Sequence, residues 1–179
     1  MILALDIGLN LGWAAGAPGV PFVSGTMVFS STGRDIGRLY YAVRSAVGSK
    51  IDENAISHVV SEAPVHIPTN GIDSIETTFG IHATVALTCK DKGLSYRRIH
   101  MATARKTVLG FSRAPADVAK HRRREWLKSR IVGYCIARGW KPESDDAADA
   151  LINLEFTCRE IDPTYAAASA VEEMARGVA

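Results

Sequence analysis

Acidic side chains crowd one short stretch, ESDDAADALINLEF (residues 143–156), where the chain turns from polar to apolar. Ser144 is a good helix N-cap, so Asp145 and Asp146 would fall in the first turn, at the positive end of the helix dipole. Asp149 lies beyond that turn and three residues after Asp146, so both carboxylates project from one helical face. Like charges at this spacing are unfavourable unless a cation lies between them. The stretch therefore suggests a metal site that needs further carboxylates from elsewhere.

Two more acids stand at the ends of predicted buried strands. Asp6 is embedded in the apolar run ILALDI (residues 2–7), and Glu62 lies near the end of SHVVSEAPV (residues 57–65), which a proline terminates. A buried acid needs a partner, and hard cations such as Mg²⁺ prefer oxygen ligands. No His or Cys cluster competes for a softer metal. We therefore take four acids as candidate catalytic and metal-ligating residues: Asp6, Glu62, Asp146 and Asp149.

Such a set of acids suits phosphodiester chemistry. Two divalent ions about 4 Å apart can activate a water and stabilise the leaving oxygen of a phosphodiester. The expected cofactor is Mg²⁺, with Mn²⁺ as a substitute and two ions per site. This expectation requires segments distant in the sequence to converge in space.

The positive charge of the chain is concentrated in one segment. The 179 residues carry a net charge of only +2, but residues 97–141 hold thirteen Lys and Arg against two acids. A charge run of this kind is most often a solvated helix face. Here it lies close to a set of acids that needs a polyanionic substrate, so phosphate contacts are favoured. We expect such contacts from the stretch KHRRREWLKSR (residues 120–130).

Length and composition predict one domain with a real hydrophobic core, since 47% of the residues are hydrophobic. Three widely spaced cysteines suggest neither a disulfide framework nor a zinc site. No apolar run reaches membrane-spanning length, and no signal peptide is expected. These features predict a cytoplasmic protein with reduced thiols and no membrane association.

Hydrophobic periodicity outlines the fold. Three strands in succession come first, from 2–7, from the GWAAG stretch after a GLNLG turn, and from 22–29. Strands at 57–65 and 95–101 then alternate with helices, expected at 34–50, 73–92, 102–109, about 116–138 and after Ser144. In the helix at 73–92, four residues are expected to pack inward: Phe79, Ala83, Ala86 and Leu87. This order predicts an α/β fold with a mixed five-stranded sheet, its first three strands antiparallel, flanked by helices.

Four motifs taken together resemble one nuclease family. LALDIGLNLGWA, VVSEAP, TARKTVLG and SDDAADAL, in this order and at these separations, resemble the RuvC-type Holliday junction resolvases of the RNase H-like superfamily, especially those of phages and prophages. The likeness covers about residues 1–156, and its most specific part combines D-x-G-x-x-x-G-W-A with D-x-x-D-A-L. It implies an RNase H-like nuclease domain at residues 1–160, followed by a C-terminal helix or tail at 161–179.

The resemblance implies a metal-dependent endonuclease that cuts branched DNA, most readily a Holliday junction by paired nicks, and leaves 5′-phosphate and 3′-hydroxyl ends. Asp6 and Glu62 would ligate metal, Asp149 would complete the site, and Asp146 would assist. Two symmetric cuts need two active sites, so a homodimer without a nucleotide cofactor is expected, in the cytoplasm of a bacterial or phage-infected cell. The small-residue helix around Gly80, Ala83 and Ala86 is the expected dimer contact. The residues expected to contact DNA are Arg105, Lys106, Lys120, Arg122, Arg123 and Arg124.

Several features leave other interpretations open. GFSRAPADVAK replaces the glycine- and lysine-bearing stretch usual in RuvC-type proteins, which affects the match at Lys120 and the expected junction specificity. The alternatives are a non-catalytic RNase H-like nucleic-acid-binding module and, less favoured at this length, an actin-like ATPase. Asp145 is interpreted as a first-turn acid, and His66 and His82 receive no catalytic role. The tryptophans are expected to pack in the core or between helices: Trp13, Trp126 and Trp140.

Overall fold

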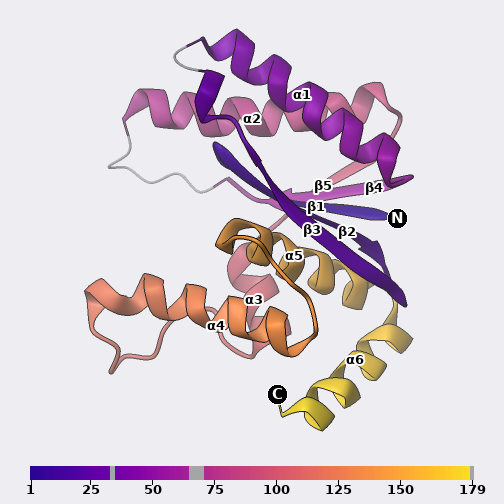
Figure 1. Cartoon of the computed structure of the whole chain (residues 1–179), viewed down its shortest axis with the longest axis vertical. Helices are drawn as coiled ribbons and strands as arrows, with labels where there is room; N and C mark the ends of the chain where they lie inside the picture. The colour runs from indigo at the N-terminus through magenta and orange to yellow at the C-terminus, as the bar shows by residue number, and fades with distance from the viewer. Residues whose placement is uncertain (33–34, 65–70, 178–179) are drawn as a thin grey trace.

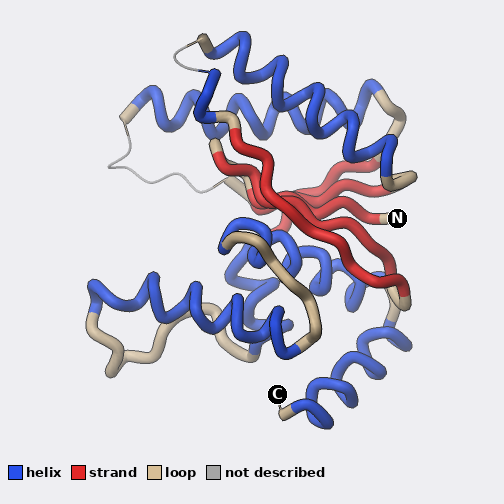
Figure 2. The backbone as a smooth tube through the Cα atoms, in the orientation of Figure 1, coloured by secondary structure: helices blue, strands red, loops and turns tan. Residues whose placement is uncertain are grey.

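A mixed five-stranded sheet lies between two layers of helices (Figures 1 and 2). This computed structural model describes residues 1–32, 35–64 and 71–177. The strands are β1 (Ile2–Asp6), β2 (Asn10–Ala17), β3 (Val20–Val28), β4 (His58–Glu62) and β5 (Ser95–Ile99). The α-helices are α1 (Ile36–Glu53), α2 (Ile72–Asp91), α3 (Met101–Leu109), α4 (Arg123–Ala137), α5 (Asp145–Ile161) and α6 (Pro163–Arg176), and the 3₁₀ helices are η1 (Ser30–Thr32) and η2 (Lys120–Arg122).

The strands are ordered β3-β2-β1-β4-β5. β2 pairs antiparallel with both β1 and β3, whereas β4 runs parallel to β1 and to β5. Helices α1 and α2 cover one face of the sheet, and α5, with α3 and α4 beyond it, covers the other (Figure 1). The predicted fold class is thus confirmed, including the antiparallel arrangement of the first three strands.

Side-chain alternation along the central strands decides which face each residue serves. On β1, Ile2 and Ala4 pack with the α3–α5 layer, whereas Leu3 and Leu5 pack with the α1–α2 layer. Successive side chains on a strand point to opposite faces, so Asp6 continues the row of Ile2 and Ala4. The first acid of the predicted set therefore lies on the α5 side of the sheet.

Helix α2 turns a different face inward from the one predicted. Its buried side chains include Ile81, Val85 and Cys89, whereas Phe79 and Leu87 are 43% and 54% exposed. Both sides of this helix carry apolar residues, so periodicity alone does not identify the core face. Ala83 is exposed as well, so the expected packing role of Phe79, Ala83 and Leu87 is wrong.

The basic segment begins its helix later than predicted. Residues 111–119 form turns and bends, and α4 starts only at Arg123. The Arg123 side chain donates hydrogen bonds to the carbonyl oxygens of Val118 (3.0 Å) and Ala116 (3.2 Å). The guanidinium thus satisfies two carbonyl groups that helical hydrogen bonds would otherwise have paired.

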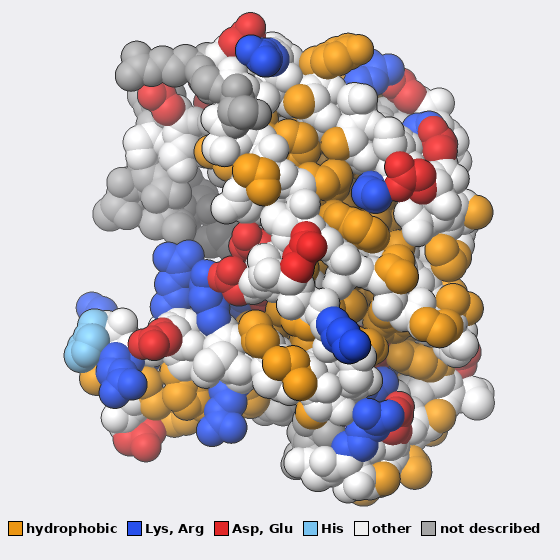
Figure 3. Space-filling model, in the orientation of Figure 1, with side chains coloured by type: hydrophobic (Ala, Val, Ile, Leu, Met, Phe, Trp, Pro, Cys, Tyr) orange, Lys and Arg blue, Asp and Glu red, His pale blue; other side chains and the backbone are white. Residues whose placement is uncertain are grey.

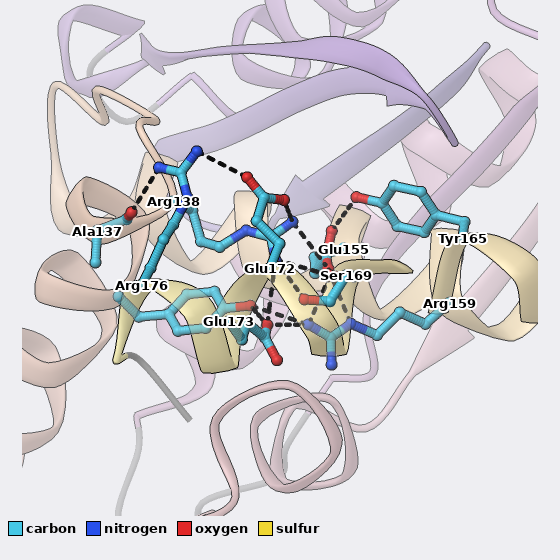
Figure 4. Close-up of polar contacts among 10 residues, drawn as sticks. Ala137, Arg138, Glu155, Arg159, Tyr165, Ser169, Glu172, Glu173 and Arg176 are labelled. Atoms are coloured by element: carbon cyan, nitrogen blue, oxygen red, sulfur yellow. Dashed lines mark hydrogen bonds and ion pairs between the residues drawn. The ribbon is translucent and has the colours of Figure 1, made fainter. Parts of the chain in front are cut away.

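Helix α6 docks through a buried polar network that ties it to α4 and α5 (Figure 4). Glu155 accepts hydrogen bonds from Arg159 (2.8 Å) and Ser169 (2.6 Å), while Arg138 donates to Ser169 (2.8 Å). Glu173 contacts both arginines. The buried side of α6 is therefore polar, and its outward side carries apolar residues such as Val171 and Met174.

Other sequence expectations can be located as well. Trp140 packs against Phe22 at a ring distance of 5.1 Å, and Trp126 packs edge-on against Phe111 at 5.2 Å. Trp13 lies at the edge of the α1–α2 core. None of the helices in the described part of the chain is long and apolar enough to cross a lipid bilayer. His66 lies in 65–70, outside the described residues.

Candidate active site

The carboxyl ends of two parallel central strands bring the first two acids together. β1 and β4 pair in register up to Leu5 opposite Ser61, so Asp6 and Glu62 follow side by side. Val60 packs in the α5-side core, and alternation places Glu62 on the same face as Asp6. The two carboxyl groups are close enough to share a hydrogen bond when one of them holds a proton.

Helix α5 presents its first turn to these strand ends because its N-terminus is anchored. The Ser144 hydroxyl accepts a hydrogen bond from the Ala147 amide (3.0 Å), which confirms the predicted N-cap. The same hydroxyl contacts Thr26 Oγ1 on β3 (2.6 Å), and Glu143 accepts a bond from the Thr26 amide (2.5 Å). These bonds hold the start of α5 against the sheet.

Gly12 allows the closest approach between α5 and the sheet. A Cβ atom at Gly12 would lie 2.0 Å from the carbonyl oxygen of Asp146 and 2.9 Å from the amide nitrogen of Ala147. Backbone meets backbone here, so no side chain could rotate away to make room. Gly12, the second glycine of the D-x-G-x-x-x-G-W-A motif, therefore sets the distance between β2 and the acids of α5.

The electrostatics of the site show that the four acids act on one another. The pKa of Asp6 is raised well above its usual value, first by burial and then by the charges of Asp149, Glu62 and Asp146. Burial also raises the pKa of Glu62, against the opposing effects of the Asp6 hydrogen bond and the charge of Arg105. Acids from three distant segments are therefore close enough for their charges to act on one another.

Asp146 lies where the acids meet both an open groove and basic residues of α4. Its pKa is raised mainly by burial and also by Asp149, while Lys128 and Arg124 act in the opposite direction. It also lines a groove with residues of the β1–β2 turn and the start of α2. Lys128 forms an ion pair with Asp145, so Asp145 has a cationic partner in addition to its place in the first helical turn.

Asp149 has a specific partner of its own. Arg105 on α3 donates a hydrogen bond to Asp149 Oδ1 at 2.9 Å, and both side chains are mostly buried, at 19% and 14% exposed. Arg105 was predicted to contact DNA, yet its guanidinium lies against a predicted metal ligand. Sequence reasoning did not find this pair or the role of Lys128.

The donor set fits hard divalent cations. Four carboxylates offer only oxygen ligands, and their mutual repulsion would be relieved by an ion between them. In the described part of the chain, no three His, Cys, Asp or Glu side chains are already arranged around a single point. For all of them to share ions, the side chains would have to rearrange, and Asp149 would have to leave Arg105.

The remaining predicted DNA-contacting residues lie mostly at the surface. Lys106, Lys120, Arg122 and Arg124 are exposed, and Arg124 is close enough to affect the charge of Asp146. Arg123 is exposed as well, but its guanidinium holds the 111–119 segment. On the face drawn in Figure 3, Lys and Arg side chains gather beside Asp and Glu side chains in a hollow of the surface. A basic border next to an acidic centre suits a nucleic-acid backbone and the ions that would act on it.

Comparison with known proteins identifies solved structures of the same fold. No protein-family model matches the sequence, and no curated protein matches it. Among solved structures, RuvC from Thermus thermophilus is similar with a TM-score of 0.62 and 15% identity, over 89% of this chain and 95% of that one.

Two further structures give the same result. The same RuvC in complex with a Holliday junction substrate has a TM-score of 0.61 at 13% identity, over 89% of this chain and 95% of that one. The yeast mitochondrial Holliday junction resolvase Ydc2 has a TM-score of 0.59 at 11% identity, over 98% of this chain and 81% of that one. The chain therefore has the fold that RuvC and Ydc2 share.

Proposed function

We propose that this chain is a metal-dependent endonuclease that cleaves phosphodiester bonds in branched DNA, with Holliday junction resolution by paired nicks as its activity. One observation carries the proposal: Asp6, Glu62, Asp146 and Asp149 come from three segments and converge where two parallel strands end. Similarity in fold to RuvC and Ydc2 supports the choice of substrate class.

The acidic and the basic residues would have different roles in this reaction. Asp6, Glu62 and Asp149 would hold two Mg²⁺ ions, with Asp146 assisting from the groove side. When bound, such ions supply an activated water and charge stabilisation at the leaving oxygen, so that 5′-phosphate and 3′-hydroxyl ends result. Exposed basic residues on α3 and around the start of α4 would hold the phosphate backbone. Contacts of that kind position a duplex without reading its bases.

Two copies would act together, because paired cuts require two active sites related by symmetry. The expected contact on α2 needs one correction. A Cβ at Gly80 would lie 1.8 Å from the Tyr40 hydroxyl, so Gly80 faces α1 within the same chain. Phe79, Ala83 and Leu87 instead form an exposed stripe along α2. We therefore place the dimer contact on that stripe.

The direct test is incubation with end-labelled four-way, forked and linear DNA, with Mg²⁺ or with chelator. We expect paired nicks in the four-way substrate only when Mg²⁺ is present. Asp6→Asn should abolish nicking but retain junction binding, because it removes a central carboxylate and leaves the basic surface intact. The matched control is Asp52→Asn, which removes only a surface pair with Lys92 and should nick like wild type.

Two results would contradict the proposal. A fully active Asp6→Asn protein would show that the acids do not bind the catalytic ions. Tight binding of junctions by the wild-type chain, with no nicking at any Mg²⁺ or Mn²⁺ concentration, would instead indicate a non-catalytic binding module.

A further inference from the structure

The position of Arg105 gives it a function inside the acidic site, and the argument rests on the proposed metal-dependent activity. We propose that Arg105 is a built-in counter-ion, which holds Asp149 whenever no divalent ion is bound and competes with a divalent ion for that carboxylate. Arg105 therefore sets how tightly the site binds its ions.

The geometry fixes Arg105 at this position. Its neighbours on α3, Ala104 and Val108, are buried in the core that also contains α5, so the helix cannot turn without breaking that packing. The Arg105 Nη2 atom lies 2.9 Å from Asp149 Oδ1. Its Nε atom is buried and has no hydrogen-bond partner within the described ranges. A guanidinium that satisfies only part of its donors is held by its charge partner more than by a complete network.

The basic residues around the site act on different carboxylates. Lys128 and Arg124 act on Asp146, on the α4 side, whereas Arg105 acts on Asp149 and Glu62, on the α3 side. An incoming divalent ion would meet the positive charge of Arg105 at the carboxylates it must bind. Because the pair is mostly buried, the repulsion is weakly screened by salt.

A surface DNA contact would look different. Lys106, the next residue, is exposed, and neutralising it removes one positive charge from the same helix without touching Asp149. A residue that serves only DNA binding should leave the ion affinity of the free protein unchanged. The comparison of these two adjacent residues therefore separates the two roles.

The experiment measures thermal unfolding of the full chain without DNA, in chelator and across titrations with Mg²⁺ and Mn²⁺. Ligands that bind the folded state raise the melting temperature, so the titration reports ion affinity independently of catalysis. Arg105→Gln should melt at a lower temperature than wild type in chelator, because Asp149 loses its cation among like charges. The ion concentration that produces a given rise in melting temperature should also be at least about fivefold lower, a typical lower bound for coupled sites.

Control variants sharpen the result. Arg105→Lys keeps the charge and should stay closer to wild type in both readouts, and Lys106→Gln should match the wild-type ion affinity. Equal or weaker ion affinity in Arg105→Gln overturns the counter-ion role.

The outcomes also separate this proposal from the proposed function. If Arg105→Gln binds ions more tightly but the wild-type chain never nicks DNA, only the proposed nuclease activity is contradicted. If the wild type nicks DNA but Arg105→Gln has unchanged ion affinity, only the counter-ion role of Arg105 is contradicted. If neither Mg²⁺ nor Mn²⁺ changes the melting temperature of the wild type, and the wild type also fails to nick DNA, both proposals are contradicted.

Discussion

Replacing Gly12 with alanine should uncouple the acids on α5 from those on the sheet. The added Cβ would lie 2.0 Å from the Asp146 carbonyl oxygen and 2.3 Å from its carbonyl carbon. Real Cβ contacts essentially never fall below 3.0 Å, so the start of α5 or the first part of β2 must move by about 1 Å. Both sides of the contact are backbone, which makes the displacement unavoidable.

The structure gives the size of the effect on stability and on activity. Overpacking of this kind costs about 1–3 kcal/mol. For a chain of this length, that corresponds to a decrease of roughly 2–12 °C in melting temperature. A misplacement of about 1 Å in a reacting geometry can lower a rate by about 100-fold. Since Asp146 is the residue displaced, we expect nicking to fall by that order even in protein that remains folded.

The assay compares Gly12→Ala with Gly133→Ala, in which the new methyl group has nothing within 4 Å. Gly133 lies inside α4, so its replacement should be neutral or stabilise the fold by up to about 1 kcal/mol. Nicking is measured at a temperature where circular dichroism shows both variants folded. A Gly12→Ala protein with wild-type melting temperature and wild-type nicking would refute the reasoning that this approach positions the acids.

Three further outcomes are expected. The double variant Arg122→Gln/Arg124→Gln should bind junction DNA more weakly and reduce the salt slope by about 0.9 for each phosphate that these side chains neutralise, whereas unchanged affinity across a salt titration would exclude a role for them in DNA binding. His82 is buried, and burial together with the charge of Arg98 lowers its pKa from 6.5 to about 4. As the pH falls from 6.5 to about 4, His82 becomes protonated in the unfolded chain but stays neutral in the folded one. The free energy of unfolding should therefore decrease by about 3 kcal/mol over this range. Urea melts of His82→Asn should show a smaller loss, and equal acid sensitivity of both proteins would contradict this assignment. Phe79→Glu should keep the wild-type circular dichroism spectrum, because Phe79 is 43% exposed, but halve the mass measured by light scattering. A mass equal to the wild-type mass would exclude the α2 stripe as the dimer contact.

The acids at the ends of strands could be predicted because the reasoning needed only local patterns. Asp6 and Glu62 each end an apolar run, and parallel strands bring such ends to one edge of a sheet. The Ser144 cap and the spacing of Asp146 and Asp149 likewise follow from helix geometry alone.

What the sequence did not reveal depends on packing between elements. Arg105 and Asp149 are 44 residues apart, and only the packing of α3 against α5 makes them partners. Lys128 could have been noticed, because it lies one helical turn after Arg124 in the basic run. The core face of α2 could not have been predicted, because Phe79 and Leu87 are as apolar as the residues of this helix that are buried.

The polar network beneath α6 restricts how this part of the protein can change over generations. Removing one member of a buried ion network leaves a charge without compensation and typically costs about 3–5 kcal/mol, whereas replacing the whole set with well-packed apolar residues can be neutral. Glu155, Arg159 and Glu173 each bond to at least one of the others. Single substitutions therefore lead through unstable intermediates, and descendants of this chain should either keep all three residues or lose them together.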